Sequence, residues 1–302
     1  MAGQSSRFTN AGYPLKHTLE LRPGLTLFEA SLRSFECLFN DKHLFLFVTR
    51  GVECTAFVRA VIEKMRAEFA IENAKDRGLS PLPPKTLNYA VCTLEGPTRG
   101  QAETAYLGIK LLKEEIEKYR INILKHNIPG FDMPGYKEDN LVIFNIDTIR
   151  KHFYSDYKNM MYRFNAYSDH GADFSYVKAN GIFDAFFDSD ADEKKWSFCS
   201  VMYPLDGKTN KPTKHPMYVT ATAEKKKISN WCSTGLYMFA NPEIFMDAYR
   251  NAIKDRRYNY YIAPLYNKMK DVLILECPPD HVEFAGVPED YEELRKKYMK
   301  SN

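Results

Sequence analysis

The first half of the chain alternates short apolar runs with longer stretches that carry a single apolar stripe. His43–Thr49 and Leu87–Leu94 are short and rich in large apolar residues, which is typical of buried strands. The segment between them has apolar residues at helical spacing, at Phe57, Val61, Met65 and Phe69. A strand, a helix and a second strand in this order favour a right-handed βαβ unit, whose strands lie parallel. The pattern therefore predicts an α/β fold.

The same alternation continues on both sides of this unit. Helices are predicted over Leu27–Phe39 and from Ala105 to Ile116, and Asn140–Ile146 is a further apolar strand. After about residue 150 the predicted strands are shorter, at Gly181–Phe187, Lys195–Met202, Met217–Ala221 and Cys232–Phe239. Further helices are predicted at Asn241-Pro242-Glu243, over Tyr260–Lys270 and from Pro288. We therefore predict a Rossmann-like three-layer α/β sandwich with a mixed, mainly parallel central sheet.

Charge, hydropathy and cysteine usage exclude several classes of protein. The 42 basic and 39 acidic residues leave a net charge of +3, which gives no general electrostatic case for binding nucleic acid. The longest apolar runs, Leu44–Val48 and Leu141–Ile146, are too short to span a bilayer, and the first residues lack the apolar segment of a signal peptide. The six cysteines occur singly, which favours free thiols. We expect a cytoplasmic protein with no nucleic-acid or membrane partner.

The N-terminal segment combines small residues with two cations. Gly3-Gln4-Ser5-Ser6 precedes Arg7, and Lys16 follows shortly after. Small side chains let backbone N–H groups approach phosphate oxygens closely, and Arg and Lys neutralise phosphate charge. A flexible Gly/Ser-rich terminus has a similar composition, so these residues alone leave both interpretations open.

Further short motifs follow in order along the chain. They are Gly100-Gln101-Ala102-Glu103-Thr104, Asn145-Ile146-Asp147, Glu224-Lys225, Ser233–Phe239, Tyr260–Asn267 and Gly286–Tyr291. Together with the segment from Met1 to Lys16, they resemble the sugar-phosphate nucleotidyltransferase family, and within it a branch associated with capsule and surface polysaccharides. The resemblance spans nearly the whole chain. It implies a single domain over residues 1–302, with a nucleotide-binding half over 1–150 and an acceptor-binding half over 151–302.

The resemblance implies a role for each motif. The loop that wraps the NTP phosphates comprises Ala2, Gly3, Gln4, Ser5 and Ser6, and Arg7 and Lys16 bind the same phosphates. The loop that reads the nucleobase contributes Gly100, Gln101, Glu103 and Thr104. Asp147 holds Mg²⁺, and Glu224 and Lys225 bind the acceptor phosphate. We interpret Trp196 as either a core residue or a wall of the acceptor pocket.

Nucleotidyl transfer depends on positioning and charge neutralisation rather than on covalent catalysis. In the expected reaction an acceptor phosphate oxygen attacks the α-phosphorus of an NTP and pyrophosphate leaves. We predict Arg7, Lys16 and Asp147 as catalytic residues, with Mg²⁺ as the cofactor bound through hard oxygen ligation. The expected partners are an NTP, with CTP slightly favoured, and a phosphorylated small molecule, with a sugar phosphate favoured. The sequence leaves a homo-oligomer open.

The chain departs from the family pattern at four places. No apolar strand precedes the N-terminal loop, and Ser5 replaces the second glycine of that loop. Phe284 stands where many relatives carry a second metal-binding Asp. Two segments, 153–173 and 208–215, look inserted, and we expect them to shape the acceptor pocket, an oligomer contact or a variable surface. The candidates to replace the missing carboxylate are Glu283, Asp184 and Asp188.

Two other interpretations stay open. Asp188-Ser189-Asp190-Ala191-Asp192 has the Asp-x-Asp spacing of a metal-bridged diphosphate site, which indicates a nucleotide-sugar-dependent glycosyltransferase on a similar fold. The missing Asp and the missing first strand indicate instead a catalytically inactive, nucleotide-sensing homologue. Pyrophosphate release from an NTP and a sugar phosphate separates both from a nucleotidyltransferase.

Overall fold

The computed structural model describes residues 6–76, 84–125, 140–155, 157–158, 179–203 and 218–300. The chain forms two compact units. The first holds Met1–Arg99, Thr104–Pro134 and Val287–Asn302, and the second holds Gly100–Glu103 and Gly135–Gly286. The chain therefore passes from one unit to the other after Arg99, Glu103, Pro134 and Gly286.

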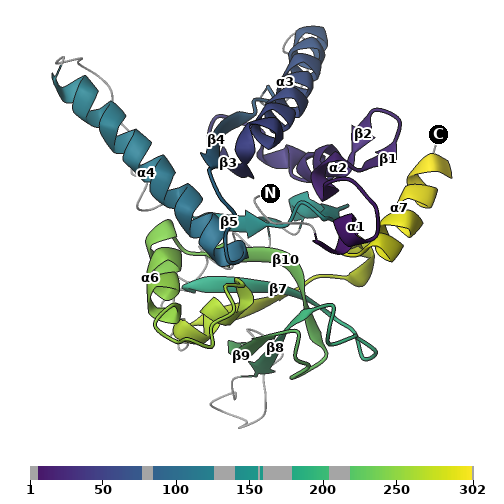
Figure 1. Cartoon of the computed structure of the whole chain (residues 1–302), viewed down its shortest axis with the longest axis vertical. Coiled ribbons are helices and arrows are strands. Elements are labelled where there is room, and N and C mark those ends of the chain that lie inside the picture. The colour runs from purple at the N-terminus through teal and green to yellow at the C-terminus, as the bar shows by residue number, and fades with distance from the viewer. Residues whose placement is uncertain are drawn as a thin grey trace, which may run out of the picture. The chain divides into compact units, whose positions relative to one another are not determined.

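The first unit is built on the predicted βαβ unit. Strand β3 (Leu44–Arg50) pairs in parallel with β4 (Asn88–Leu94), and α3 (Gly51–Asp76) connects them and packs against both (Figure 1). Of the apolar side chains predicted to face the core, Val61, Met65 and Phe69 are buried and Phe57 is half-buried. The unit also contains α1 (Ser6–Asn10), η1 (Lys16–Thr18), β1 (Glu20–Arg22), β2 (Leu25–Thr26), α2 (Leu27–Arg33), η2 (Glu36–Leu38), most of α4 (Gln101–Lys125) and α7 (Pro288–Lys300).

The predicted helix over Leu27–Phe39 is two shorter helices. Thr26 caps α2, because its hydroxyl accepts the Glu29 N–H at 3.2 Å. Helix α2 ends at Arg33, and the next residue, Ser34, donates its hydroxyl back to the Ala30 carbonyl. Serine side chains that bond to nearby backbone weaken a helix interior, which accounts for the interruption before η2.

The C-terminal helix belongs to the core of the first unit. Tyr291 of α7 packs edge-on against Phe8 and Tyr13, and the ring centroids lie 5.8 to 6.2 Å apart. The Tyr291 hydroxyl donates to the Glu20 carbonyl at 2.7 Å, and the Tyr13 hydroxyl donates to Glu292 at 2.9 Å. These contacts fix the short helix α1, which carries Arg7, against the end of the chain.

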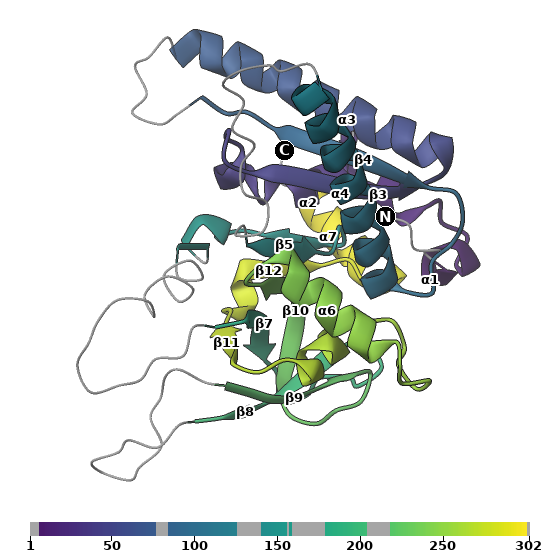
Figure 2. The same ribbon diagram turned by 90° about the vertical axis from the view of Figure 1, so that its left-hand side faces the viewer.

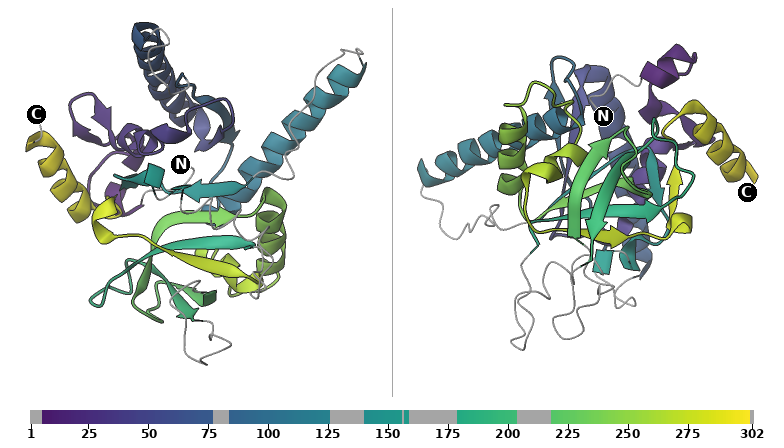
Figure 3. Two further views of the ribbon diagram at one scale, coloured as in Figure 1. Left: turned by 180° about the vertical axis from the view of Figure 1, so that it is seen from behind. Right: turned by 90° about the horizontal axis from the view of Figure 1, so that it is seen from below.

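The second unit is built on one six-stranded sheet. Its order is β5 (Leu141–Phe144), β10 (Trp231–Phe239), β7 (Gly181–Phe187), β11 (Val272–Glu276), β9 (Tyr218–Glu224) and β8 (Ser197–Met202). An additional pairing of β8 with β10 closes part of the sheet on itself, and Figure 3 shows these strands side by side. A small separate ladder joins β6 (Thr148–Arg150) to β12 (Val282–Phe284), and η4 (Pro279–His281) precedes β12.

Two helices pack on this sheet. Helix α6 (Pro242–Ala252) lies beside β10, where Phe245 packs edge-on against Phe239 with their centroids 5.1 Å apart (Figure 2). The predicted start of α6 is confirmed, because the Asn241 side chain accepts the Ile244 N–H at 2.9 Å. The helix predicted over Tyr260–Lys270 is the shorter 3₁₀ helix η3 (Ala263–Lys268), which packs on β9.

A mixed α/β fold is confirmed, but the balance of strand directions differs from the prediction. Among the strands that the structure describes, β3–β4 and β7–β11 pair in parallel and the other pairs are antiparallel. The later strands are short and closely spaced, and antiparallel pairs need only short connections. Of the two predicted insertions, 208–215 lies outside the described residues, and 153–173 lies within them only at 153–155 and 157–158.

None of the helices that the structure describes is long and apolar enough to cross a membrane.

Candidate active site

The predicted base-reading loop is held by the backbone of Tyr260. The Ala102 N–H donates to the Tyr260 carbonyl at 2.9 Å, and a Cβ atom placed on Gly100 would lie 2.6 Å from the same oxygen. Gly100 is therefore required by the close approach of two backbone segments. The Gln101 side-chain amide donates to the side-chain oxygen of Asn145. This bond joins the loop to the segment that carries the predicted metal ligand.

Asp147 lies in a turn rather than at the end of a strand. Strand β5 ends at Phe144, earlier than predicted, and Asn145–Asp147 turns into β6. The Asn145 N–H donates to the Gly235 carbonyl at 3.2 Å, and the Asp147 carbonyl accepts the Ala285 N–H at 2.8 Å. The backbone of Asp147 is thus fixed from both sides, which suits a residue whose carboxylate must be positioned.

The predicted acceptor residues come together at the ends of β8 and β9. Ser197 pairs with Glu224 in the ladder and donates its hydroxyl to the Glu224 carboxylate. The Lys225 N–H donates to the Trp196 carbonyl at 2.9 Å, so Trp196 contacts Lys225 through its backbone. The Trp196 ring itself packs edge-on against Phe284, with their centroids 4.6 Å apart, which makes it a wall of an aromatic cluster.

Lys225, the first residue of the run Lys225-Lys226-Lys227, has specific side-chain partners. Its Nζ lies 3.4 Å from the Glu224 carboxylate and donates to the Tyr261 hydroxyl at 2.9 Å. Its φ of 52° is unusual for a residue with a side chain and costs about 1–2 kcal/mol. Such strain persists only where surrounding contacts impose it, and it is concentrated at functional sites. The neighbouring lysine, Lys227, instead donates to the Ser189 carbonyl at 2.8 Å.

Tyr237 is hydrogen-bonded beside the acceptor residues, and the charge of Asp147 acts on its hydroxyl. It is a buried residue of β10, and its hydroxyl is hydrogen-bonded with Ser233 and Ser197. Burial raises the pKa of Tyr237 to about 12, and the negative charges of Glu224 and Asp147 also raise it. The phenol therefore stays protonated near both carboxylates. Nothing in the sequence singled out Tyr237, which lay inside a motif matched only as a strand.

Comparison with solved structures identifies the family. A nucleoside-diphosphate-sugar pyrophosphorylase from Vibrio cholerae RC9 is 30% identical to this chain, and the match covers 98% of each chain with a TM-score of 0.61. The chain belongs to the nucleoside-diphosphate-sugar pyrophosphorylase family. No protein-family model matches it, and no curated protein matches it.

Two more distant structures share the fold of this pyrophosphorylase family member. A UTP-bound UGPase from Acinetobacter baumannii is 12% identical over 99% of this chain and 91% of its own, with a TM-score of 0.61. An inositol-1-phosphate CTP transferase from T. maritima is also 12% identical, over 99% of this chain and 93% of its own, with a TM-score of 0.55. The solved neighbours are thus nucleotidyltransferases that use different nucleotides.

The carboxylates proposed to replace the missing Asp of the pyrophosphorylase pattern have other partners. Glu283 pairs with Lys151 at 3.1 Å. The fully buried Asp184 accepts from Arg150 and from the Thr234 hydroxyl. No group of three or more His, Cys, Asp or Glu side chains in the described part of the chain could hold a metal ion. Phe284, at the position of the missing Asp, packs into the aromatic cluster with Trp196.

The Asp-x-Asp segment is engaged in its own turn. Asp188 accepts the Asp190 N–H at 2.9 Å, and Asp192 accepts the Lys194 N–H at 2.9 Å. Carboxylates that stabilise a turn in this way are common in exposed loops. The segment therefore has a structural explanation, and it gives no support to a glycosyltransferase.

The predicted phosphate-binding residues belong to the first unit as far as they are described. Arg7 is exposed on α1, and the Lys16 Nζ lies 4.7 Å from the centroid of the Phe8 ring. The Thr104 hydroxyl is 2.6 Å from that of Thr98, whereas Glu103 is half-buried and belongs to the second unit. The predicted loop residues Ala2, Gly3, Gln4 and Ser5 lie outside the described residues, and Ser6 opens α1.

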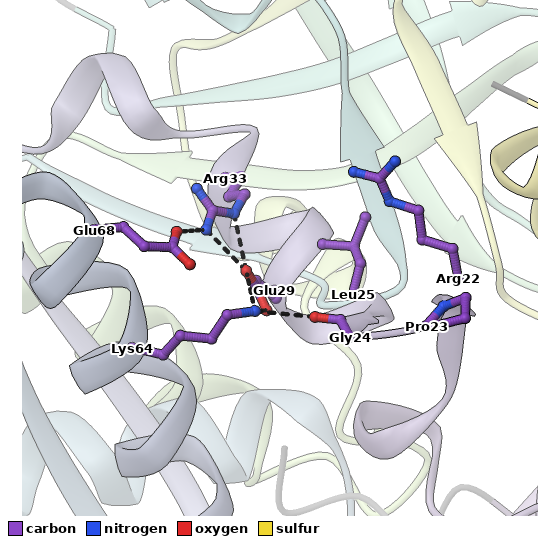
Figure 4. Close-up of a pocket in the computed structure, with 8 residues that line it drawn as sticks. All are labelled: Arg22, Pro23, Gly24, Leu25, Glu29, Arg33, Lys64 and Glu68. Carbon is purple, nitrogen blue, oxygen red and sulfur yellow. Dashed lines mark hydrogen bonds and ion pairs between the residues drawn. The ribbon is translucent and has the colours of Figure 1, made fainter. Parts of the chain in front are cut away.

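A separate pocket of the first unit contains none of the predicted site residues. Figure 4 shows Glu29 at its centre, where the nearly buried carboxylate accepts from Arg33 at 2.8 Å and from Lys64 at 2.9 Å. Lys64 also donates to the Gly24 carbonyl at 2.9 Å, and Arg33 also pairs with Glu68. Four charged residues of this pocket, Glu29, Arg33, Lys64 and Glu68, are thus paired with one another, which indicates a structural role.

Proposed function

We propose that this protein transfers a nucleoside monophosphate from an NTP to a phosphorylated acceptor, favouring a sugar phosphate, and releases pyrophosphate. The observation that carries the proposal is the arrangement in the second unit. There the Gln101–Asn145 hydrogen bond joins the Gly100–Glu103 loop to the segment of the Asp147 turn. Tyr237 is hydrogen-bonded with Ser197, and the charges of both Glu224 and Asp147 act on its hydroxyl. Membership of the pyrophosphorylase family supports the same reaction.

Each residue has a task that needs no covalent intermediate. The Lys225 ammonium binds and orients the acceptor phosphate, so that one of its oxygens faces the α-phosphorus in line with the departing pyrophosphate. Glu224 orients Lys225 and accepts from acceptor hydroxyls. Arg7 and Lys16 stabilise negative charge on the β- and γ-phosphates. One domain carries the reaction, with most nucleotide-binding residues in 1–150 and the acceptor-binding residues in 151–302.

The donor set fits a magnesium ion that arrives with the nucleotide. Mg²⁺ in nucleotide sites is commonly bound by one or two carboxylates together with phosphate oxygens and water. Asp147 supplies one carboxylate, while Glu283 and Asp184 are paired with cations. Bound there, the ion would neutralise charge that develops on the phosphates. With Asp147 as the one proposed carboxylate ligand, we expect weak Mg²⁺ binding to the protein without NTP.

The proposal also covers the preferred nucleotide and the biosynthetic role. We propose CTP as the slightly favoured nucleotide and synthesis of a surface-polysaccharide precursor as the role, because the closing motifs resemble the capsule-associated branch. A related fold, the enzyme from T. maritima, is named as a CTP transferase, whereas the Acinetobacter baumannii structure holds UTP.

The first test is pyrophosphate release with Mg²⁺ from CTP, UTP, dTTP, ATP and GTP against a panel of phosphorylated acceptors. We expect release with one preferred nucleotide and only with an acceptor present. Asp147→Asn should lower kcat by a factor on the order of 10² to 10³, because it removes charge at the metal without changing size. Asp41→Ala, an exposed Asp of the first unit, is the matched control. Nucleotide binding without turnover across the whole panel would instead support a sensor.

A further inference from the structure

Two adjacent tyrosines contact the nucleotide side and the acceptor side of the proposed site. The Tyr260 carbonyl accepts the Ala102 N–H at 2.9 Å and lies against Gly100, both in the base-reading loop. The next residue, Tyr261, accepts a hydrogen bond from the Lys225 Nζ at 2.9 Å. The base-reading loop and the acceptor lysine, which are more than a hundred residues apart in the chain, are thus hydrogen-bonded to two consecutive residues.

The backbone of these two tyrosines is fixed. Tyr260 has a φ of 61°, which a residue with a side chain adopts only when its surroundings impose it. The Tyr258 hydroxyl donates to the Tyr261 carbonyl at 2.7 Å, and the following residue, Ile262, is fully buried. A shift of the Tyr260 carbonyl would therefore be transmitted to the Tyr261 side chain rather than absorbed by a flexible loop.

The geometry at Lys225 shows what the Tyr261 hydroxyl does. An ammonium group has three N–H donors on a long flexible stem. One points to Tyr261, and the Glu224 carboxylate lies 3.4 Å from the same nitrogen. The Tyr261 ring centroid is 4.6 Å away, which adds a cation–π contact. These contacts leave one donor for a phosphate oxygen and limit the directions in which it can point.

We propose that Tyr261 is a positioning residue that orients Lys225 toward the acceptor phosphate, and that Tyr260-Tyr261 couples the base-reading loop to this lysine. The inference rests on the proposed function and deepens it. A displacement of the loop that accompanies binding of the nucleotide changes the Tyr260 carbonyl contact, and Tyr261 transmits the change to Lys225. The acceptor phosphate is then held in its productive orientation when the nucleotide is bound.

The test is Tyr261→Phe, which removes the hydroxyl and keeps the ring beside Lys225. We expect the KM for the phosphorylated acceptor to rise about tenfold, the effect typical of losing a hydrogen bond to a charged group, with the KM for the NTP changed less than about twofold. In a Lys225→Met background the same substitution should have no further effect on acceptor KM. Tyr89→Phe, which removes a hydroxyl bonded to Glu63 in the first unit, is the matched control.

A second variant tests the coupling. Gly100→Ala places a Cβ against the Tyr260 carbonyl, so it should raise the acceptor KM as well as the NTP KM. The rise in acceptor KM should be much smaller when Tyr261→Phe is already present. Equal effects of Gly100→Ala in the two backgrounds would overturn the coupling.

Inorganic phosphate gives a readout that does not depend on turnover. Line broadening in ³¹P NMR should report weaker phosphate binding to Tyr261→Phe than to the parent protein and Tyr89→Phe. If the parent protein releases pyrophosphate but Tyr261→Phe changes neither acceptor KM nor phosphate binding, the inference is wrong. If no pair of substrates gives pyrophosphate while Tyr261→Phe still weakens phosphate binding, the proposed function is wrong and the role of Tyr261 in binding phosphate stands.

Discussion

Gly235 shows how a single residue without a side chain can position the predicted metal ligand. Its φ is 83°, and a Cβ atom at this position would lie 2.8 Å from the Asn145 Nδ2 and 3.3 Å from the Thr148 hydroxyl. Asn145 and Thr148 flank the turn that carries Asp147. A side chain at Gly235 would therefore strain the backbone and also push on this turn.

Gly235→Ala is expected to reduce stability and turnover together. The left-handed backbone costs about 1–2 kcal/mol for alanine, and displacement of Asn145 should lower kcat for pyrophosphate release. Gly24→Ala is the matched control, because Gly24 has a φ of 77° with no atom within 4 Å of an added Cβ. Urea unfolding should show a similar decrease in the free energy of unfolding for both variants. Kinetic assays should show slower turnover for Gly235→Ala alone. Equal turnover in the two variants would contradict this role of Gly235.

At the scale of elements, a buried ion pair ties β6, β7 and β10 together. Arg150 of β6 and Asp184 of β7 are almost completely buried, and both contact the Thr234 hydroxyl of β10. Removing one partner of a buried ion pair leaves an uncompensated charge in the interior, whereas replacing both by apolar residues is often tolerated. Strand β6 directly follows the Asp147 turn, so the pair ties the strand after this turn to β7 and β10.

Arg150→Met is expected to lower the free energy of unfolding by about 3–5 kcal/mol. The double variant Arg150→Met/Asp184→Leu should recover a large part of this loss, which denaturant unfolding measures. Lys151→Met is the control, since Lys151 pairs with Glu283 at a more exposed position and such pairs contribute about 0–1 kcal/mol. A double variant less stable than Arg150→Met would mean that the pair itself is favourable.

The elements themselves were largely predictable, and their pairing was not. The predicted strand over Gly181–Phe187 has the observed bounds, and the Asn241 cap was read correctly from three residues. These features depend on local periodicity and capping chemistry. The partner and the direction of each strand depend on contacts between residues far apart in the sequence. The prediction of a mainly parallel sheet was therefore wrong for the second unit. Strands β6 and β12 were missed because three residues carry no periodicity.

The sequence named the motifs of the candidate site, but it did not predict the contacts between their side chains. The family pattern named Asp147, Glu224 and Lys225, and these motifs stay predictions of function. It gave no role to Tyr261 or Tyr237, although both lie inside matched motifs. The contacts of Tyr261 with Lys225 and of Tyr237 with Ser197 join segments far apart in the sequence. For Lys225 the run Lys225-Lys226-Lys227 left both a solvated and an acceptor-binding side chain open, and only the fold shows its bond to Tyr261.

At the scale of the whole molecule, stability should depend on pH through His17. His17 is buried beside Phe57, and burial lowers its pKa to about 4 from an ordinary value near 6.5. Between these values the unfolded chain binds a proton that the folded chain does not, so the free energy of unfolding falls as the pH falls. The loss amounts to as much as about 3 kcal/mol between pH 6.5 and pH 4.

His17→Leu should remove this part of the pH dependence. Urea unfolding at several values between pH 4 and pH 6.5 should give a shallower decline for the variant than for the parent protein. Above pH 6.5 the contribution is constant, so the difference between the two proteins should no longer change with pH. Parallel curves over the acid range would show that His17 titrates normally in the folded protein.

The path of the chain has a consequence for how the protein is made. The first unit needs Tyr291 of α7 to pack against Phe8 and Tyr13, yet the whole second unit is synthesised between them. During translation Phe8 and Tyr13 therefore lack the packing of Tyr291 until the C-terminal helix has left the ribosome. The second unit can finish its sheet first, because its last strand precedes α7. A nascent chain stalled before Val287 would thus expose apolar N-terminal surface that α7 normally covers, and we expect chaperones to bind it.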